Sequence, residues 1–116
     1  MQPARIAPRT LTKADVIRYV AVCFERESPP RVDELAALCA ATRECVTRRF
    51  AVDHGYPLSA FLKELQIARA ISLLRHSALS TTTIAYRCAF GTRRTFFRAF
   101  RRRTGITPDQ FRRARL

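Results

Sequence analysis

The feature that most constrains this chain is an internal repeat with a spacing of fifty residues. Self-similarity over tens of residues indicates one supersecondary unit that is used twice. Each copy follows a short apolar pair that suits a helix start, Leu35-Ala36 in the first and Ile84-Ala85 in the second. The positions that match after the shift are Thr42 and Thr92, Arg43 and Arg93, Arg48 and Arg98, Phe50 and Phe100, Gly55 and Gly105, and Phe61 and Phe111.

Both copies have the order of a helix, a tight turn, a second helix and a glycine stop. Thr42 and Thr92 stand where the second helix of each copy would need an N-cap. Gly55 and Gly105 stand where that helix would end. This order is typical of a helix-turn-helix unit, whose second helix enters the major groove of DNA. Sequence-specific DNA binding is therefore the leading hypothesis for this chain.

The spacing of apolar residues predicts seven helices and no strand. The expected helices cover residues 12–27, 32–39, 43–52, 57–76, 81–88, 93–103 and 107 onward. The predicted fold class is all-α and bipartite, with two helix-turn-helix motifs joined by a long linker helix. Its expected divisions are a flexible arm at 1–10, a first lobe at 11–56, the linker at 57–77 and a second lobe at 78–116. The linker would be about 27 Å long, and with a lobe docked at each end it could set the ~34 Å between successive major grooves.

The charge of the chain favours a polyanionic partner. The net charge is +13, and the segment from Arg87 to Leu116 holds ten basic residues against one acid, Asp109. Charge of this strength and clustering is typical of nucleic-acid binding. Arginine supplies all but two of the basic residues, Lys13 and Lys63. Because arginine bonds phosphates and guanine edges with two donors at once, this usage suits DNA.

Other classes of function lack a pattern in this sequence. The four cysteines (Cys23, Cys39, Cys45 and Cys88) show no metal-ligand spacing, so we expect buried thiols and neither a metal nor a cofactor. No nucleophile, base and orienting group form a recognisable set, so we expect no enzyme activity and no catalytic residue. No apolar run has the length of a membrane span or a signal peptide. We therefore expect a cytoplasmic, nucleoid-associated protein without membrane contact.

The outer faces of the two capped helices carry the residues that could read DNA. A recognition helix buries one stripe, here Val46 and Phe50 or Phe96 and Phe100, and presents polar side chains near its N-terminus. Arg48 and Arg98 lie on those outer faces and are the strongest candidates for groove contacts. Phe97 remains open between a place in the core and a contact to a thymine methyl group.

The motifs of the chain resemble those of the AraC/XylS family of bacterial transcription regulators, over about Ala14 to Arg113. The matching residues are Leu35-Ala36 with Arg48-x-Phe50, Gln66-Ile67-Ala68-Arg69-Ala70, Ile84-Ala85, Cys88-Ala89-Phe90, Phe96 with Phe100, Gly105-Ile106-Thr107-Pro108 and Phe111-Arg112. The resemblance implies a bipartite all-α DNA-binding domain with two groove-reading helices. Transferred by position, the candidates for base contacts are Glu44, Thr47, Arg48, Arg93, Arg94, Phe97 and Arg98. The candidates for phosphate contacts are Thr42, Arg43, Thr92, Arg101 and Arg102.

The sequence departs from the family pattern at four positions. Ala40 and Ala89 replace the usual turn glycines, and we expect Gly91 to take over the second turn. An alanine held at positive φ costs on the order of 1 kcal/mol. Gln66 replaces a usual arginine, and Arg31 replaces a usual capping serine or threonine.

These observations predict a transcription regulator that binds double-stranded DNA as a monomer. The resemblance adds activation as its mode of action and RNA polymerase as a further partner. Because Glu44 and Thr47 differ from their counterparts Arg94 and Phe97, the expected site is not a palindrome. The alternatives are a nonspecific nucleic-acid-binding protein and a helical protein-interaction module. Whether the chain is a small complete regulator or one domain of a longer one stays open.

Overall fold

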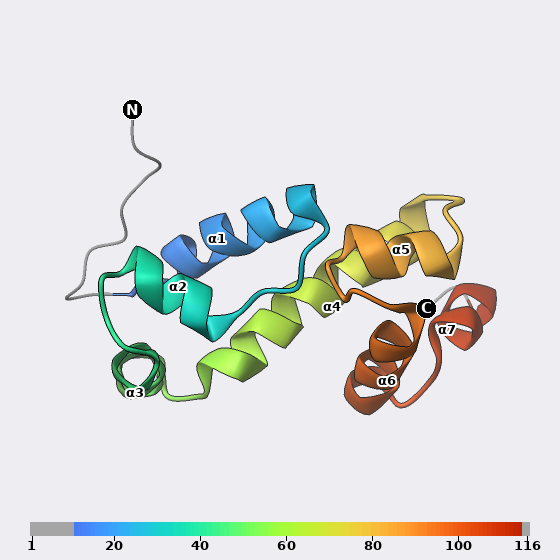
Figure 1. Ribbon diagram of the computed structural model, residues 1–116. Coiled ribbons are helices and arrows are strands. Elements are labelled where there is room, and N and C mark those ends of the chain that lie inside the picture. The colour runs from blue at the N-terminus through green and yellow to red at the C-terminus, as the bar shows by residue number, and fades with distance from the viewer. Residues whose placement is uncertain (1–10, 115–116) are drawn as a thin grey trace.

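The computed structural model describes residues 11–114, which form seven helices and no strand (Figure 1). The helices are α1 (Lys13–Arg26), α2 (Val32–Leu38), α3 (Arg43–His54), α4 (Leu58–His76), α5 (Thr81–Arg87), α6 (Arg93–Thr104) and α7 (Pro108–Ala114). The predicted all-α fold with a long linker helix is confirmed. The largest difference in bounds is at α3, which continues past Val52 to His54. The arm expected at 1–10 lies outside the described residues.

Helix α4 joins two hydrophobic clusters. Its first half contributes Leu58, Phe61 and Leu62 to a cluster with α1, α2 and α3. Its second half contributes Ile67 and Leu74 to a cluster with α5, α6 and α7. With 19 residues the helix is about 28 Å long, so the two clusters lie along one continuous rod (Figure 1).

The caps that the repeat predicts are present in both copies. The Thr42 hydroxyl accepts the Cys45 N–H at 3.1 Å, and the Thr92 hydroxyl accepts the Thr95 N–H at 3.1 Å. Gly55 and Gly105 end α3 and α6 in the left-handed region, with φ of 83° and 87°. Only glycine enters that region without strain, which explains its recurrence fifty residues apart.

Alanine occupies the left-handed position in both helix-turn-helix turns. Ala40 has φ 52° and Ala89 has φ 63°. In each turn the next N–H reaches back to the helix, from Ala41 to the Ala36 carbonyl at 3.0 Å and from Phe90 to Ala85 at 2.9 Å. These are the bonds of a Schellman motif, which requires the left-handed residue just before the donor.

The expectation that Gly91 would take over the second turn was wrong. Ala89 itself adopts the left-handed conformation, and Gly91 adopts a second one two residues later, with φ 83°. The reason is the length of the turn, because 88–92 is one residue longer than 39–42. Phe90, which is buried, corresponds to Ala41, because both donate the equivalent bond back to the preceding helix. Gly91 therefore occupies the additional position, just before the N-cap Thr92.

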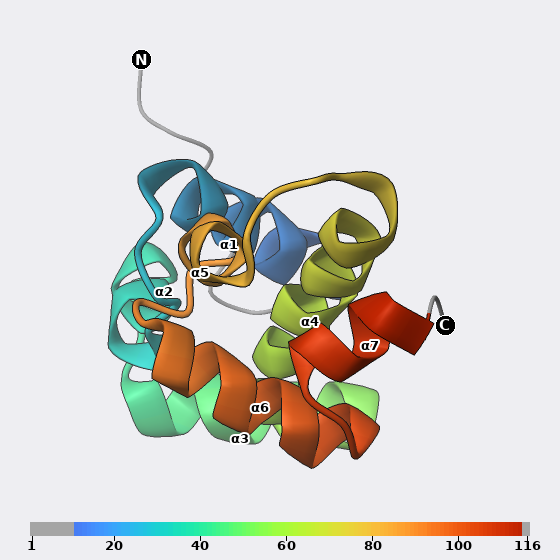
Figure 2. The same cartoon turned by 90° about the vertical axis from the view of Figure 1, so that its right-hand side faces the viewer.

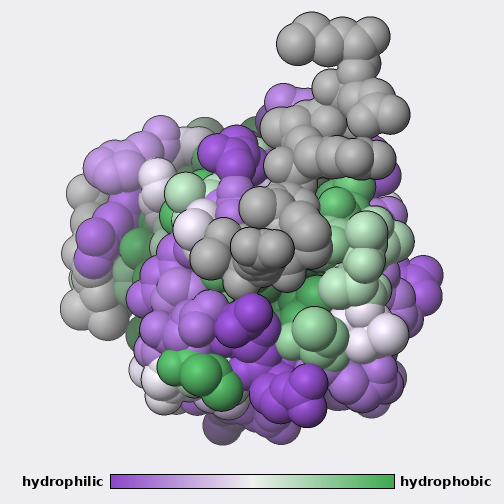
Figure 3. All heavy atoms as spheres, turned by 90° about the vertical axis from the view of Figure 1, so that its left-hand side faces the viewer, coloured by the Kyte–Doolittle hydropathy of each residue, from purple (hydrophilic) through white to green (hydrophobic). Residues whose placement is uncertain are grey.

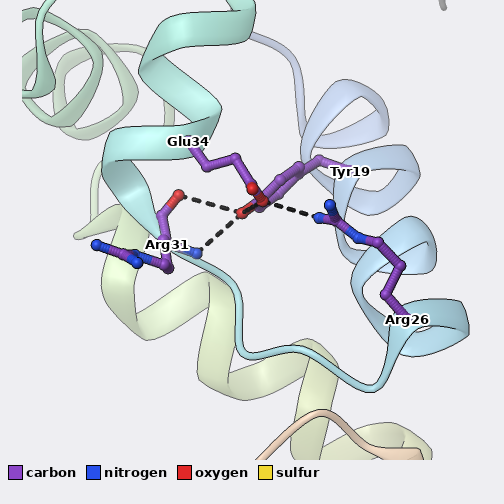
Figure 4. A network of polar contacts seen from close by, with 4 residues as sticks. All are labelled: Tyr19, Arg26, Arg31 and Glu34. Atoms are coloured by element: carbon purple, nitrogen blue, oxygen red, sulfur yellow. Dashed lines mark hydrogen bonds and ion pairs between the residues drawn. The ribbon is translucent and has the colours of Figure 1, made fainter.

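A tyrosine from α1 bonds to the residue that precedes α2 (Figure 4). Arg31 is the N-cap residue, and its side chain makes no capping bond. Instead its N–H donates to the hydroxyl oxygen of the buried Tyr19 at 2.9 Å, and that hydroxyl lies 2.7 Å from Glu34 Oε1. The Arg26 guanidinium also donates to Glu34 Oε1, at 2.9 Å. The hydrogen bond from Tyr19 and the charge of Arg26 hold the pKa of Glu34 below its usual range, and burial raises the pKa of Tyr19.

Arg112 of the last helix, α7, attaches that helix to the chain at the C-terminal end of α4. The guanidinium group of Arg112 donates to the carbonyl oxygens of Leu79 at 2.6 Å and Ser77 at 3.1 Å. A cation at a helix C-terminus is favoured by the helix dipole. The ring of Phe111 packs against Phe100 with centroids 5.5 Å apart, so α7 is fixed to both α4 and α6.

We expect Ala40→Gly to stabilise the fold by about 0.5–1 kcal/mol, because glycine removes the strain of a left-handed alanine and the lost methyl group is exposed. Ala89→Gly should change the stability by less than this, because burial of its methyl group offsets the strain. Urea-induced unfolding of both variants measures the difference. An equal gain in both variants would contradict this account of the turns.

We expect Tyr19→Phe to destabilise the protein by about 1–2 kcal/mol at neutral pH, because the Arg31 N–H loses its acceptor. The folded pKa of Glu34 is lowered, so its contribution is present above the unfolded pKa and is lost as the pH falls through the folded pKa. The difference between wild type and variant should therefore shrink in acid. Urea unfolding at a series of pH values tests this, and a difference that grows in acid would refute it.

Candidate nucleic-acid interface

Helices α3 and α6 lie on the same edge of the molecule. In Figure 1 both are at the lower edge, on either side of α4, and α1 lies at the upper edge. After a turn of 90° both remain at the lower edge and run in nearly the same direction (Figure 2). The longest axis of the molecule is 44 Å, so its length is sufficient to span the ~34 Å between successive major grooves on one side of B-DNA.

Helix α3 buries one stripe and exposes its N-terminal polar residues. Val46 and Phe50 are buried, and the sequence-derived candidates on this helix and its cap are all exposed: Thr42, Arg43, Glu44, Thr47 and Arg48. Arg43 differs from the others because it pairs with Asp33 of α2, with the charged atoms 3.4 Å apart. Figure 3 shows this end of the molecule, where hydrophilic side chains cover most of the lower part and hydrophobic ones are scattered among them.

Helix α6 carries the largest concentration of positive charge. It contains six arginines and no acidic residue. The candidates Thr92, Arg93, Arg94, Arg98, Arg101 and Arg102 are all exposed. Within residues 11–114, four of them make no ion pair with a carboxylate: Arg94, Arg98, Arg101 and Arg102. Arg103 at the helix end pairs with Glu64 of α4 at 3.8 Å. The uncompensated charge therefore lies on the exposed edge, where a polyanion would be attracted.

Phe97 and Arg93 form a stacked pair at the start of α6. Phe97 is half-buried, and its ring packs edge-on against Phe96 with centroids 5.8 Å apart. The Arg93 guanidinium lies 3.9 Å from the centre of the Phe97 ring, and it also pairs with Asp109 of α7 at 3.4 Å. Of the two places considered for Phe97, the structure shows an intermediate one: Phe97 packs on the second cluster and stays partly exposed, with Arg93 over its ring. Arg93 is thus the most constrained of the candidate arginines.

A groove between α4 and α6 places two residues that sequence reasoning did not select, Lys63 and Thr95, beside two that it did. Its volume is about 470 Å³, and Lys63, Thr95, Arg98 and Arg102 line it. Burial lowers the pKa of Lys63, whose ammonium lies 5.4 Å from the centre of the Phe90 ring. Nothing in the sequence marks Lys63 for this place, since only the packing of α6 on α4 puts it beside α6.

The cysteines occupy interior positions. Cys23, Cys39 and Cys88 are buried thiols, and Cys45 is half-buried at the start of α3. Burial raises the pKa of the Cys88 thiol to about 12 and also raises that of Cys39, so both are protonated and unreactive at neutral pH. Within residues 11–114, no group of side chains could hold a metal ion, and no helix is long and apolar enough to cross a membrane.

The fold and its basic edge define a bipartite helix-turn-helix protein. Residues 35–114 match the model of a family described as a helix-turn-helix domain. The chain belongs to the AraC/XylS family of DNA-binding transcription regulators.

Curated relatives support this membership. An HTH-type transcriptional regulator of Mycobacterium tuberculosis is 36% identical over 84 residues, which are 72% of this chain and 32% of the relative. The HTH-type transcriptional activator RhaR of Cronobacter sakazakii is 41% identical over 63 residues, which are 54% of this chain and 22% of the relative. The chain spans about a third or less of the length of these relatives.

Solved structures show the same architecture. The DNA-binding domain of AdpA, solved in complex with a target DNA, is 29% identical with a TM-score of 0.73, covering 84% of this chain and 90% of that one. The C-terminal domain of AraT, a response regulator from Geobacillus stearothermophilus, is 21% identical with a TM-score of 0.81, covering 93% of this chain and 88% of that one. The second likeness concerns the fold alone.

Proposed function

We propose that this chain reads a non-palindromic site in double-stranded DNA by placing α3 and α6 in two adjacent major grooves. The observation that carries the proposal is the exposure of the polar N-terminal parts of both helices along one edge (Figures 1 and 2). A single chain then supplies both reading elements, so it acts as a monomer on its site. In this assignment 11–56 and 78–116 are the two reading lobes and 57–77 is the spacer.

The candidate contacts divide by where they lie on the helices. Arg48 and Arg98 are exposed at the sixth residue of α3 and of α6, so we assign them to base edges, where arginine prefers guanine. Arg101 and Arg102 lie in the last turn of α6, farther from the end that enters the groove. The further base-contact candidates are Glu44, Thr47, Arg93, Arg94 and Phe97. The phosphate candidates are Thr42 and Thr92, whose helix N-termini attract anions, together with Arg43, Arg101 and Arg102.

Activation of transcription is the mode of action that the relatives favour. Several of the similar curated proteins are described as the transcriptional activator RhaR. In this role RNA polymerase is the second partner. Run-off transcription from a template that carries the site tests the direction of the effect: more transcript is expected, and less transcript would indicate a repressor.

Selection of binding sites from random duplexes at fixed salt tests the proposal as a whole. An enriched asymmetric site with two parts about one helical turn apart is expected. A bound pool without sequence preference would indicate a nonspecific nucleic-acid-binding protein. The absence of DNA binding, with retention of an acidic protein, would indicate a protein-interaction module.

We expect Arg98→Ala to lower affinity for the selected site by roughly 10- to 100-fold, as for the loss of a base contact of about 1–3 kcal/mol. Binding to random DNA should weaken much less, because one phosphate-attracting charge among many is lost. Arg18→Ala is the matched control, since Arg18 pairs with Asp15 on α1 at the opposite edge (Figure 1). Titration of labelled duplexes measures both affinities, and equal losses on the two DNAs would remove Arg98 from base reading.

We expect Arg101→Gln and Arg102→Gln to act differently from Arg98→Ala. If each contacts one phosphate, each substitution should reduce the slope of log affinity against log salt by about 0.9, equally on selected and random DNA. Affinities measured between low and moderate salt give the slopes. A change in the selected sequence at any base pair would contradict their assignment to phosphates.

A further inference from the structure

Two loops that belong to different lobes meet directly over α4. One is 27–31, which joins α1 to α2, and the other is 88–92, which joins α5 to α6 (Figure 1). A methyl group added at Gly91 would lie 3.3 Å from the Pro29 side chain. The Arg87 and Glu27 side chains form an ion pair at 3.6 Å. The last residue of α5 therefore contacts the loop that leads into α2, across the boundary between the lobes.

Gln66 of α4 fixes the second loop from below. It is the buried polar residue of the described chain, with 2% of its surface exposed. Its amide nitrogen donates to the Cys88 carbonyl at 3.2 Å and to the Ala89 carbonyl at 3.0 Å. A buried amide with two acceptors holds both in place, because leaving either acceptor unpaired is unfavourable.

The loop 88–92 also packs across the lobe boundary. Ala89 is fully buried, and it belongs to the hydrophobic cluster of α1, α2 and α3, although its neighbours Cys88 and Phe90 belong to the other cluster. On the same side of α4, the Arg69 guanidinium lies 4.7 Å from the centre of the Phe24 ring of α1. Hydrogen bonds thus connect this loop to α4, and the packing of Ala89 connects it to the first lobe. The Arg69–Phe24 contact and the Arg87–Glu27 ion pair join the two lobes beside it.

This connection bears on the placement of α6. The loop ends at Thr92, which caps α6, and the loop 27–31 ends at Arg31, which is the N-cap of α2. The loop 27–31 therefore leads into the first helix-turn-helix unit, and the loop 88–92 is the turn inside the second. The attachment fixes how far and at what angle the N-terminus of α6 stands from α3, in addition to the spacing that α4 sets.

We propose that Gln66 is a positioning residue that makes the protein selective for the number of base pairs between the two parts of its site. This inference rests on the proposed function, because spacing matters only when both helices bind one duplex. Each added base pair moves one major groove by about 3.4 Å and rotates it by about 35° relative to the other. A rigid pair of recognition helices can match only one spacing, whereas a loosened pair can follow the shift.

The test uses the selected site and duplexes with one base pair added or removed between its two parts. Wild type should lose about 10-fold or more in affinity on either altered duplex. Gln66→Met keeps the side-chain length and apolar packing but removes both donors. It should bring the loss on the altered duplexes down to about 3-fold or less. A substitution that only lowers the folded fraction weakens binding to all spacings equally, so the ratio of affinities separates positioning from stability.

A second pair of variants keeps the test independent of how Gln66→Met folds. Gly91→Ala and Gly105→Ala both place a methyl group on a left-handed glycine, with φ of 83° and 87°. At Gly91 the methyl group presses on Pro29, and at Gly105 it meets nothing within 4 Å. Gly91→Ala should therefore relax the spacing preference, and Gly105→Ala should leave it unchanged.

The outcomes are distinguishable. Failure of wild type to select a site with two parts overturns the proposed function, and this inference with it. Strict spacing in wild type that persists in Gln66→Met and in Gly91→Ala overturns the inference alone. Loss of the preference in Gly105→Ala as well would assign the effect to backbone strain and also overturn it.

Discussion

Burial of α4 against two different sets of helices is the constraint on which the arrangement of this protein depends. Neither helix-turn-helix unit covers its own apolar face, and each completes its core with one half of α4. Because both cores use the same rod, the positions of α3 and α6 are set relative to one helix. The distance between α3 and α6 is thereby a property of packing and not of a flexible linker.

The second lobe combines strong anchoring with high charge. Six arginines on one helix of 12 residues repel one another. On its inner side the same helix inserts Phe96 and Phe100, both fully buried, among the rings of Phe90 and Phe111. The burial of these two aromatic side chains can hold α6 in place although its exposed arginines repel one another. The charge is thus kept on a rigid surface, where it is available to a polyanion.

The parts of this fold that could be predicted are those that depend on local sequence. The caps at Thr42 and Thr92 and the glycine stops involve bonds within four residues, so the repeat alone was sufficient. The expectation that Gly91 would replace Ala89 in the second turn was wrong, because the backbone conformation there depends on the length of the turn. The Tyr19–Arg31 bond spans twelve residues and the Gln66–Ala89 bond spans twenty-three. Such contacts depend on packing between elements, which no periodicity in one sequence specifies. The same holds for Lys63 beside α6.

The two recognition helices are similar in backbone and unlike in charge, and this difference divides their work on DNA as we propose it. Helix α6 has no acid to offset its arginines, so its attraction to phosphate is strong for any sequence. Helix α3 carries Glu44 in its first turn and Asp53 near its end, which offset part of the charge of its three arginines. A carboxylate at the groove repels phosphate and tolerates few base edges, chiefly the amino group of cytosine. If both helices read one duplex as we propose, the first unit contributes less affinity and more discrimination, and the fixed spacing on α4 lets the strong contact of α6 hold α3 against its bases.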